Sequence, residues 1–178
     1  NRVFMRLQPW SSKAIVSKIE GGIGDRFLSH YNFESSYLKL SGKVNWNSAY
    51  LYGGAEGQYK DLFHWDATGE YVFLGEQMND LSLGGNMNFT FRPFRRDRTS
   101  PVSLKLHAET SLKTPDYYTQ HFHGNHYKWD KAFDKISLTK IQGAMDIPSW
   151  KMRAEAGYAL SANNIYYNTS SEIKQNRA

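Results

Sequence analysis

The segment LSLGGNMNFTFR, residues 81–92, decides the fold class, because its apolar and polar side chains alternate without a break. The following segment, VSLKLHAETSLK at residues 102–113, repeats the alternation. Successive side chains of a strand point to opposite faces, whereas the apolar positions of a helix recur every three to four residues. Both segments are therefore predicted to be β-strands.

The same alternation of apolar and polar residues, with a period of two, extends along most of the chain. Four further strands are predicted at residues 49–59, 64–74, 139–147 and 151–161, and less regular candidates lie at 2–8, 13–19, 37–45 and near Ile165. The total is about nine or ten strands, with no helix. The polar stretches 20–36 and 114–134 are predicted to be long loops, and the glycine-rich run at 20–25 opens the first of them. Short links are predicted at 60–63, 76–79, 93–100 and 148–150.

Composition excludes several classes of protein. No window of the 178 residues approaches the roughly 18 uninterrupted apolar residues that a membrane-spanning helix needs. The formal charge of +5 comes from scattered lysine and arginine, whereas a nucleic-acid-binding protein usually gathers its basic residues on one face or tract. There is no cysteine, so thiol catalysis, thiolate metal sites and disulfides are absent. A soluble β-rich domain and a transmembrane β-barrel both fit what remains.

Strand length and loop asymmetry favour the transmembrane barrel over a soluble β-sandwich. The best segments reach the 9–11 residues that a membrane-crossing strand needs, while soluble strands average about five or six. Tight turns alternate with long polar connections, although the short link at 76–79 departs from that scheme. Aromatic residues beside the short turns are predicted to form a girdle at one membrane interface: Trp10, Phe63, Trp65, Phe94 and Trp150. The predicted fold is an all-β, antiparallel, up-and-down transmembrane β-barrel.

One face of the predicted strands carries nearly all of their charged residues. In a barrel this face lines the lumen, since apolar side chains face lipid and polar ones face the interior. The predicted pore-lining residues are Glu56, Asp66, Glu70, Arg92, Lys105, His107, Glu109, Lys140, Asp146, Arg153 and Glu155. Because both signs are present, we expect weak charge selectivity at most.

No catalytic or metal centre is predicted. His121, His123 and His126 share the second long loop, but their spacing matches no closed zinc motif. Asp66 and Glu70 stand four positions apart on one strand, about 13 Å, which is too far for a retaining glycosidase. We expect no enzymatic activity and no cofactor.

Matching the apolar faces across each short turn predicts the register of two hairpins. Ile147 is expected opposite Met152, which places Asp146 opposite Arg153. In the other hairpin, Tyr59 is expected opposite Trp65, which places Gly53 opposite Tyr71.

Several stretches resemble an outer-membrane β-barrel porin family of Bacteroidota. They are YLYGGAEGQ at residues 50–58 followed by Trp65 and GEY at 69–71, LKTPDYY at 112–118 followed by NHYKWD at 125–130, and GYAL at 157–160 followed by NIYY at 164–167. The resemblance covers most of the chain from about residue 47 onward. It implies a bacterial outer-membrane protein that gives passive passage to small hydrophilic solutes, or a non-conducting barrel that serves as a structural or binding subunit of a larger complex.

The resemblance also implies that residues 1–178 are one barrel segment of a longer protein, because members of that family are longer than this chain. The polar stretch 172–178 likewise differs from the amphipathic strand with a terminal aromatic residue that ends a bacterial barrel. We therefore expect an internal fragment that does not close a barrel alone. Its expected partners are outer-membrane lipid and, through loop 114–134, other outer-membrane proteins; no nucleic acid is expected.

Overall fold

The computed structural model describes residues 1–8, 14–33, 40–92, 101–124 and 127–176, and nearly all of its regular structure is strand. The strands of the main sheet are β1 (Arg2–Leu7), β2 (Lys18–Phe33), β3 (Leu40–Tyr59), β4 (Phe63–Gly75), β5 (Leu81–Phe91), β6 (Val102–Lys113), β9 (Ile136–Ile147) and β10 (Met152–Ala162). Smaller elements are α1 (Tyr117–Gln120), β7 (His121–His123), β8 (Lys128–Asp130), η1 (Pro148–Trp150), β11 (Ile165–Tyr167) and β12 (Ile173–Gln175).

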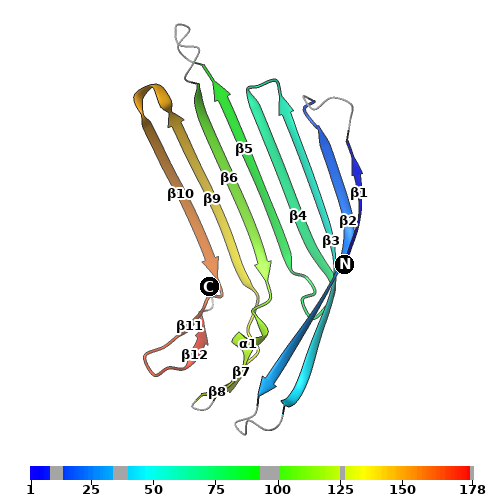
Figure 1. The fold of residues 1–178 in the computed structure, drawn as a ribbon. Helices are drawn as coiled ribbons and strands as arrows, with labels where there is room; N and C mark the ends of the chain where they lie inside the picture. The colour runs from blue at the N-terminus through cyan, green and yellow to red at the C-terminus, as the bar shows by residue number, and fades with distance from the viewer. Residues whose placement is uncertain (9–13, 34–39, 93–100, 125–126, 177–178) are drawn as a thin grey trace.

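The main sheet has eight strands in the order β1-β2-β3-β4-β5-β6-β9-β10, and every neighbouring pair is antiparallel (Figure 1). Strands β7 and β8 lie within the connection from β6 to β9, so the sheet is an up-and-down meander. β1 and β10 stand at opposite edges and do not pair, which leaves the sheet of the described residues open. This agrees with the expectation that the chain does not close a barrel alone.

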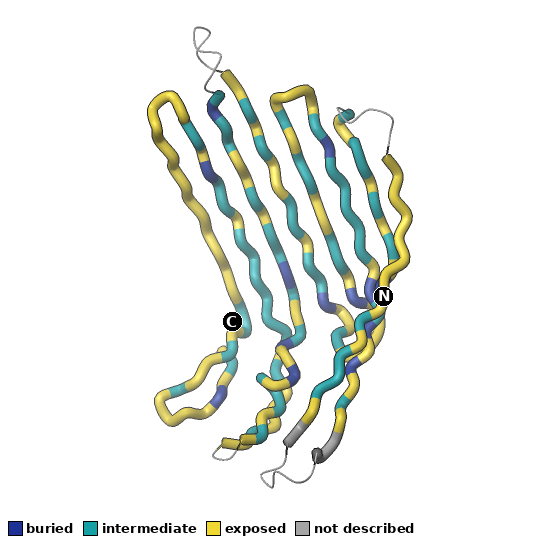
Figure 2. Tube along the Cα trace, in the orientation of Figure 1, coloured by how far each residue is buried: buried dark blue, intermediate teal, exposed yellow. Residues whose placement is uncertain are grey.

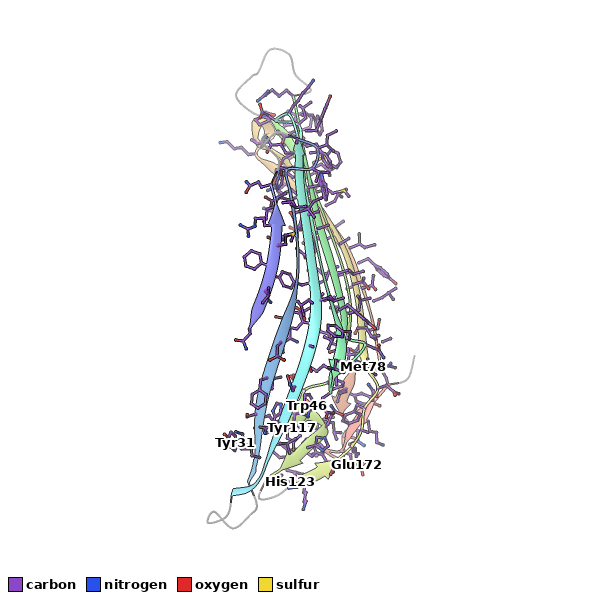
Figure 3. All side chains as sticks on the ribbon, turned by 90° about the vertical axis from the view of Figure 1, so that its right-hand side faces the viewer. Tyr31, Trp46, Met78, Tyr117, His123 and Glu172 are labelled. Atoms are coloured by element: carbon purple, nitrogen blue, oxygen red, sulfur yellow. The ribbon has the colours of Figure 1, made fainter. Side chains whose placement is uncertain are left out.

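The sheet is a single layer with side chains on both sides (Figure 3). Burial is correspondingly sparse, and Figure 2 shows few buried positions along the strands. Among the described residues only seven hydrophobic side chains are buried: Trp46, Tyr50, Val72, Val102, Tyr117, Ala144 and Ile173. Neither helical element in the described part of the chain is long and apolar enough to cross a membrane.

The prediction of a long loop at 20–36 is wrong. Residues 18–33 form β2 instead, and residues 40–45 and 49–59 of the two strands predicted next are parts of the single 20-residue strand β3. Residues 34–39 of these predictions lie outside the described residues. The strand predicted at 13–19 is also wrong, because β2 begins at Lys18. Two of the glycines that suggested a loop are required by close packing: a Cβ on Gly22 would lie 2.2 Å from the carbonyl oxygen of Val3, and one on Gly24 would lie 2.2 Å from the ring of Tyr50, which covers this position.

The register is confirmed in one hairpin and corrected in the other. Met152 pairs with Ile147 and Arg153 with Asp146, as predicted. Across the β3–β4 turn, however, Tyr59 pairs with Phe63 and Gly53 with Gly69, a shift of two positions. The turn is tighter than predicted because Lys60 adopts a left-handed φ of 51°, and Phe63 joins β4 with its ring stacked on Phe89 at 4.6 Å. Since two positions are one full repeat of a strand, the predicted faces are unchanged.

A bulge interrupts the β3–β4 ladder between Ala49 and Tyr50, where β4 ends. Gly75 closes this end with a φ of +103°, and a Cβ there would lie 1.9 Å from the carbonyl oxygen of Asn47. The position therefore accepts glycine only, both for its backbone conformation and for the approach of β3.

Gly75→Ala is expected to destabilise the folded protein by about 1–3 kcal/mol, since the new side chain combines an unfavourable φ with a backbone clash. The measurement is the unfolding midpoint in detergent, followed by circular dichroism. Gly21→Ala is the matched control, because a Cβ at Gly21 meets nothing closer than the Tyr52 carbonyl oxygen at 3.7 Å. Equal losses of stability in the two variants would contradict this explanation.

Candidate functional site

The side chains on one face of the sheet, here called the polar face, form rows that run from strand to strand. The clearest row crosses seven strands in register: Lys18, Glu56, Asp66, Asn86, His107, Gln142 and Gly157. Hydrogen bonds run along it: Asn86 Nδ2 donates to Asp66 Oδ2 at 2.8 Å, and His107 Nδ1 lies 2.7 Å from Asn86 Oδ1. The opposite side of the sheet is called the apolar face.

Ten of the eleven residues predicted to line a pore lie on the polar face within strands. They are Glu56, Asp66, Glu70, Lys105, His107, Glu109, Lys140, Asp146, Arg153 and Glu155. Arg92 follows the last residue of β5 and is exposed. The sheet thus brings the predicted set onto one continuous surface, and the lining of a pore by this surface stays a prediction.

Charges on the polar face are mostly compensated by neighbours of the opposite sign. Lys105 Nζ lies 3.2 Å from Asp146 Oδ2, and Arg153 lies 3.7 Å from Asp146 and 3.3 Å from Glu155. Glu109 stands opposite Lys140 in the register. Such exposed pairs contribute only about 0–1 kcal/mol each to stability, so their main effect is to cancel the local field.

A second group of charges, near the first strands, was missed by the sequence prediction. Arg26 Nη2 lies 2.8 Å from Glu70 Oε1, a pair that spans the intervening strand β3. Arg2 Nε donates to the hydroxyl of Tyr50 at 2.8 Å, and the guanidiniums of Arg2 and Arg26 lie 5.6 and 5.0 Å from the Tyr50 ring centroid. The sequence pattern that could have predicted this group is the spacing of Lys18, Glu20 and Arg26 at even positions of β2, which the glycines of this strand obscured.

Described members of the predicted aromatic girdle lie at the short-turn end of the sheet, the end that carries the β3–β4 and β9–β10 turns. Phe63 and Trp65 are on the apolar face at the start of β4, and Trp150 is exposed in η1. Trp65 Nε1 donates to the carbonyl of Ile15 at 2.8 Å. Trp10 and Phe94 lie outside the described residues.

At the other end, the long-loop end, β2 and β3 extend beyond the neighbouring strands and contact the loop 114–134 (Figure 1). Tyr117 of this loop is 5% exposed, stacked on His30 at 4.5 Å and edge-on to Trp46 at 5.6 Å. Figure 3 shows Trp46 and Tyr117 together in this region. The aromatic loop packs against the hairpin of β2 and β3 and is not a freely solvated excursion.

Asp80, only 8% exposed, holds both ends of this loop. Its carboxylate accepts hydrogen bonds from Thr114 N at 2.9 Å and Thr114 Oγ1 at 2.7 Å, and pairs with Lys135. Lys135 also donates to the carbonyl of Met78 at 2.8 Å. The short β4–β5 turn is thereby joined to the first residue of the loop and to the residue that leads into β9.

Two of the three histidines of the loop, His121 and His123, lie within the described residues. His121 Nδ1 lies 2.6 Å from Asp130 Oδ1 across the β7–β8 ladder, and His126 lies outside the described residues. Within the ranges that the structure describes, no three metal-binding side chains cluster.

The β11–β12 hairpin adds to the long-loop end. Lys131 Nζ donates to the carbonyl of Ile173 at 2.8 Å, and Trp129 lies edge-on to Tyr167 at 6.0 Å. In its turn, a hydrogen bond from Asn168, together with Lys174, lowers the pKa of Glu172. The turn therefore gains stability above the carboxyl's unfolded pKa and loses it as the pH falls through the lower folded value.

Asp80→Ala should destabilise the protein by about 1–3 kcal/mol, because it leaves the Thr114 N–H without its acceptor and removes the carboxylate that compensates the charge of Lys135. Chymotrypsin should also cut loop 114–134 faster. Asp61→Ala, in the exposed β3–β4 turn, is the control and should change stability by less than about 0.5 kcal/mol. An unfolding midpoint and a cleavage rate equal to those of the control would show that Asp80 does not anchor the loop.

Comparison with known proteins gives one match. The sequence profile of a family described as "Putative porin" matches residues 8–178. No curated protein and no solved structure matches the chain.

Proposed function

Because the chain belongs to this porin family, we propose that it forms part of the wall of a water-filled barrel in a bacterial outer membrane and gives passive passage to small hydrophilic solutes. The observation that carries the proposal is a single-layer sheet with two chemically different faces. On strands β4, β5, β6, β9 and β10 the apolar face has no charged side chain. Lipid is the partner that suits such a face.

The exposure of the apolar face supports contact with lipid. Large side chains there are open to their surroundings, with Leu83 45% and Ile141 57% exposed, and no second layer of the described residues covers them. A soluble sheet of this size would bury that face against another element. In a bilayer the hydrocarbon chains take the place of that element.

The two edge strands of the sheet, β1 and β10, determine whether these strands can span a membrane without further strands. In hydrocarbon, each unpaired backbone N–H or C=O costs several kcal/mol, so strands span membranes only in closed rings. The free edges of β1 and β10 therefore require further strands, and the polar face becomes the inner wall of the completed ring.

The complete barrel, purified with the further strands that close its ring, is expected to form channels in a planar lipid bilayer that pass cations and anions with a reversal potential near zero in a KCl gradient. The reason is the mutual compensation of charges on the polar face. Replacing Glu56, Asp66 and Glu70 together by their amides should shift the preference toward anions, while Asp61→Asn in the turn should not.

A correctly folded protein that does not conduct would contradict the proposed passage of solutes. It would favour the second candidate function, that of a structural or binding subunit. The ordered aromatic surface at the long-loop end supports this second candidate. A strongly ion-selective wild-type channel would instead contradict the compensation of charges.

The loop 114–134 is proposed to narrow the mouth of the barrel, since it is held against the β2–β3 hairpin and by Asp80. Tyr117→Ala removes the buried ring that packs the loop against His30 and Trp46. It should raise single-channel conductance, as should deletion of residues 116–133. Tyr127→Ala, at a position that is 56% exposed, is the matched control and should leave conductance unchanged. If all three variants have the conductance of the wild-type protein, the loop lies away from the solute path.

A further inference from the structure

A hollow of about 320 Å³ opens on the polar face over β9 at Ala144, whose side chain is a single methyl group. Lys105 on β6 and Glu155 on β10 flank Ala144 in the register. The same row continues through Asn88 on β5 to His64 on β4. The hollow therefore exists because a small residue interrupts a row of large polar ones. Its size is at the lower end of the range for small-molecule sites.

Planar polar groups form the walls. The adjacent row supplies Asn86, His107 and Gln142, with Gln142 Nε2 donating to Glu155. Arg153, also in the wall, is held by Asp146 and Glu155. These contacts fix the orientation of amide, imidazole and guanidinium groups before any solute arrives, which lowers the entropic cost of binding.

Two groups in the hollow retain unused hydrogen-bonding capacity. Asn88 Oδ1 is buried and has no hydrogen-bond partner. His64 makes no side-chain hydrogen bond within the described residues, so its ring can both donate and accept. An acceptor without a partner costs free energy. This oxygen is closed to solvent in the free protein, so a solute hydroxyl reaches it only when the Asn88 amide turns toward the hollow. This site thus favours a solute that brings hydroxyl groups.

Charge identifies the class of solute. Lys105, Arg153 and Glu155 line the hollow, and Asp146 beside it pairs with both cations. Because these four charges sum to zero, neither an anion nor a cation is favoured. Hydroxyl groups both donate and accept, as do the amide and imidazole groups of the walls. We propose that this hollow is a binding subsite for a neutral sugar ring on the path of permeating solutes. The proposal rests on the function proposed above, because it assumes that the polar face is reached by solutes.

Binding can be measured without conduction, by isothermal titration of the detergent-solubilised protein with maltose and cellobiose, and with glucuronate and glucosamine as charged comparisons. Wild-type protein should bind at least one neutral disaccharide more tightly than either charged sugar. Asn88→Leu removes the buried acceptor and Ala144→Leu fills the hollow, so each should weaken binding by about tenfold or more, which is about 1.4 kcal/mol.

Thr90→Leu is the matched control, since Thr90 is half-buried on the same face of β5 as Asn88 but lies outside the hollow. It should leave the affinity unchanged. Absence of neutral-sugar binding by the wild type, or equal affinity in Asn88→Leu, Ala144→Leu and Thr90→Leu, would overturn the subsite. Circular dichroism of each variant establishes that it is folded. A protein that conducts but does not bind loses the subsite alone, and one that binds but does not conduct loses only the passage of solutes.

Discussion

Each inner strand of the sheet satisfies its backbone amides and carbonyls through two neighbours, and this ladder fixes the face on which every side chain lies. The ladder is continuous from β1 to β10 in register, apart from shifts in the β2–β3 and β3–β4 pairs. In a hydrophobic medium the ladder is also the only source of partners for the backbone. Alternation of apolar and polar residues, a single layer and the need for closure into a ring all follow from it.

The same ladder explains how much of the fold could be predicted from the sequence. β5, β6 and β10 were predicted to within about one residue, because each strand has unbroken alternation and is bounded by proline or a short turn. β2 was not predicted, because Gly22 and Gly24 interrupt the polar half of its pattern between Glu20 and Arg26. The need for glycine comes from a neighbouring strand: Gly24 lies under Tyr50, which is 26 positions later in the sequence. Local sequence patterns do not contain such a contact.

The candidate site shows the same division between local and long-range information. Alternation was enough to place Glu56, Lys105 and Arg153 on one face, since a side chain's face depends only on its position along the strand. The partners could not be predicted in this way. Arg26 reaches Glu70 across an intervening strand, and Asp80 joins residues 34 and 55 positions away. Such contacts depend on register and on the course of the loop, which a two-position change in one turn can alter.

In the proposed channel, the pairing of charges on the polar face has a consequence for selectivity. A wall lined by unpaired charges of one sign would sort solutes by charge through its field. Here Asp146 lies between Lys105 and Arg153, and Glu70 pairs with Arg26. The electrostatic field of each charge is therefore largely cancelled by its partner. What still varies along the surface is shape, set by where small residues such as Ala144 and Gly157 replace large polar ones. Discrimination among solutes should therefore arise from the fit of hydroxyl groups into those hollows more than from net charge, and a neutral solute would gain most from such a wall.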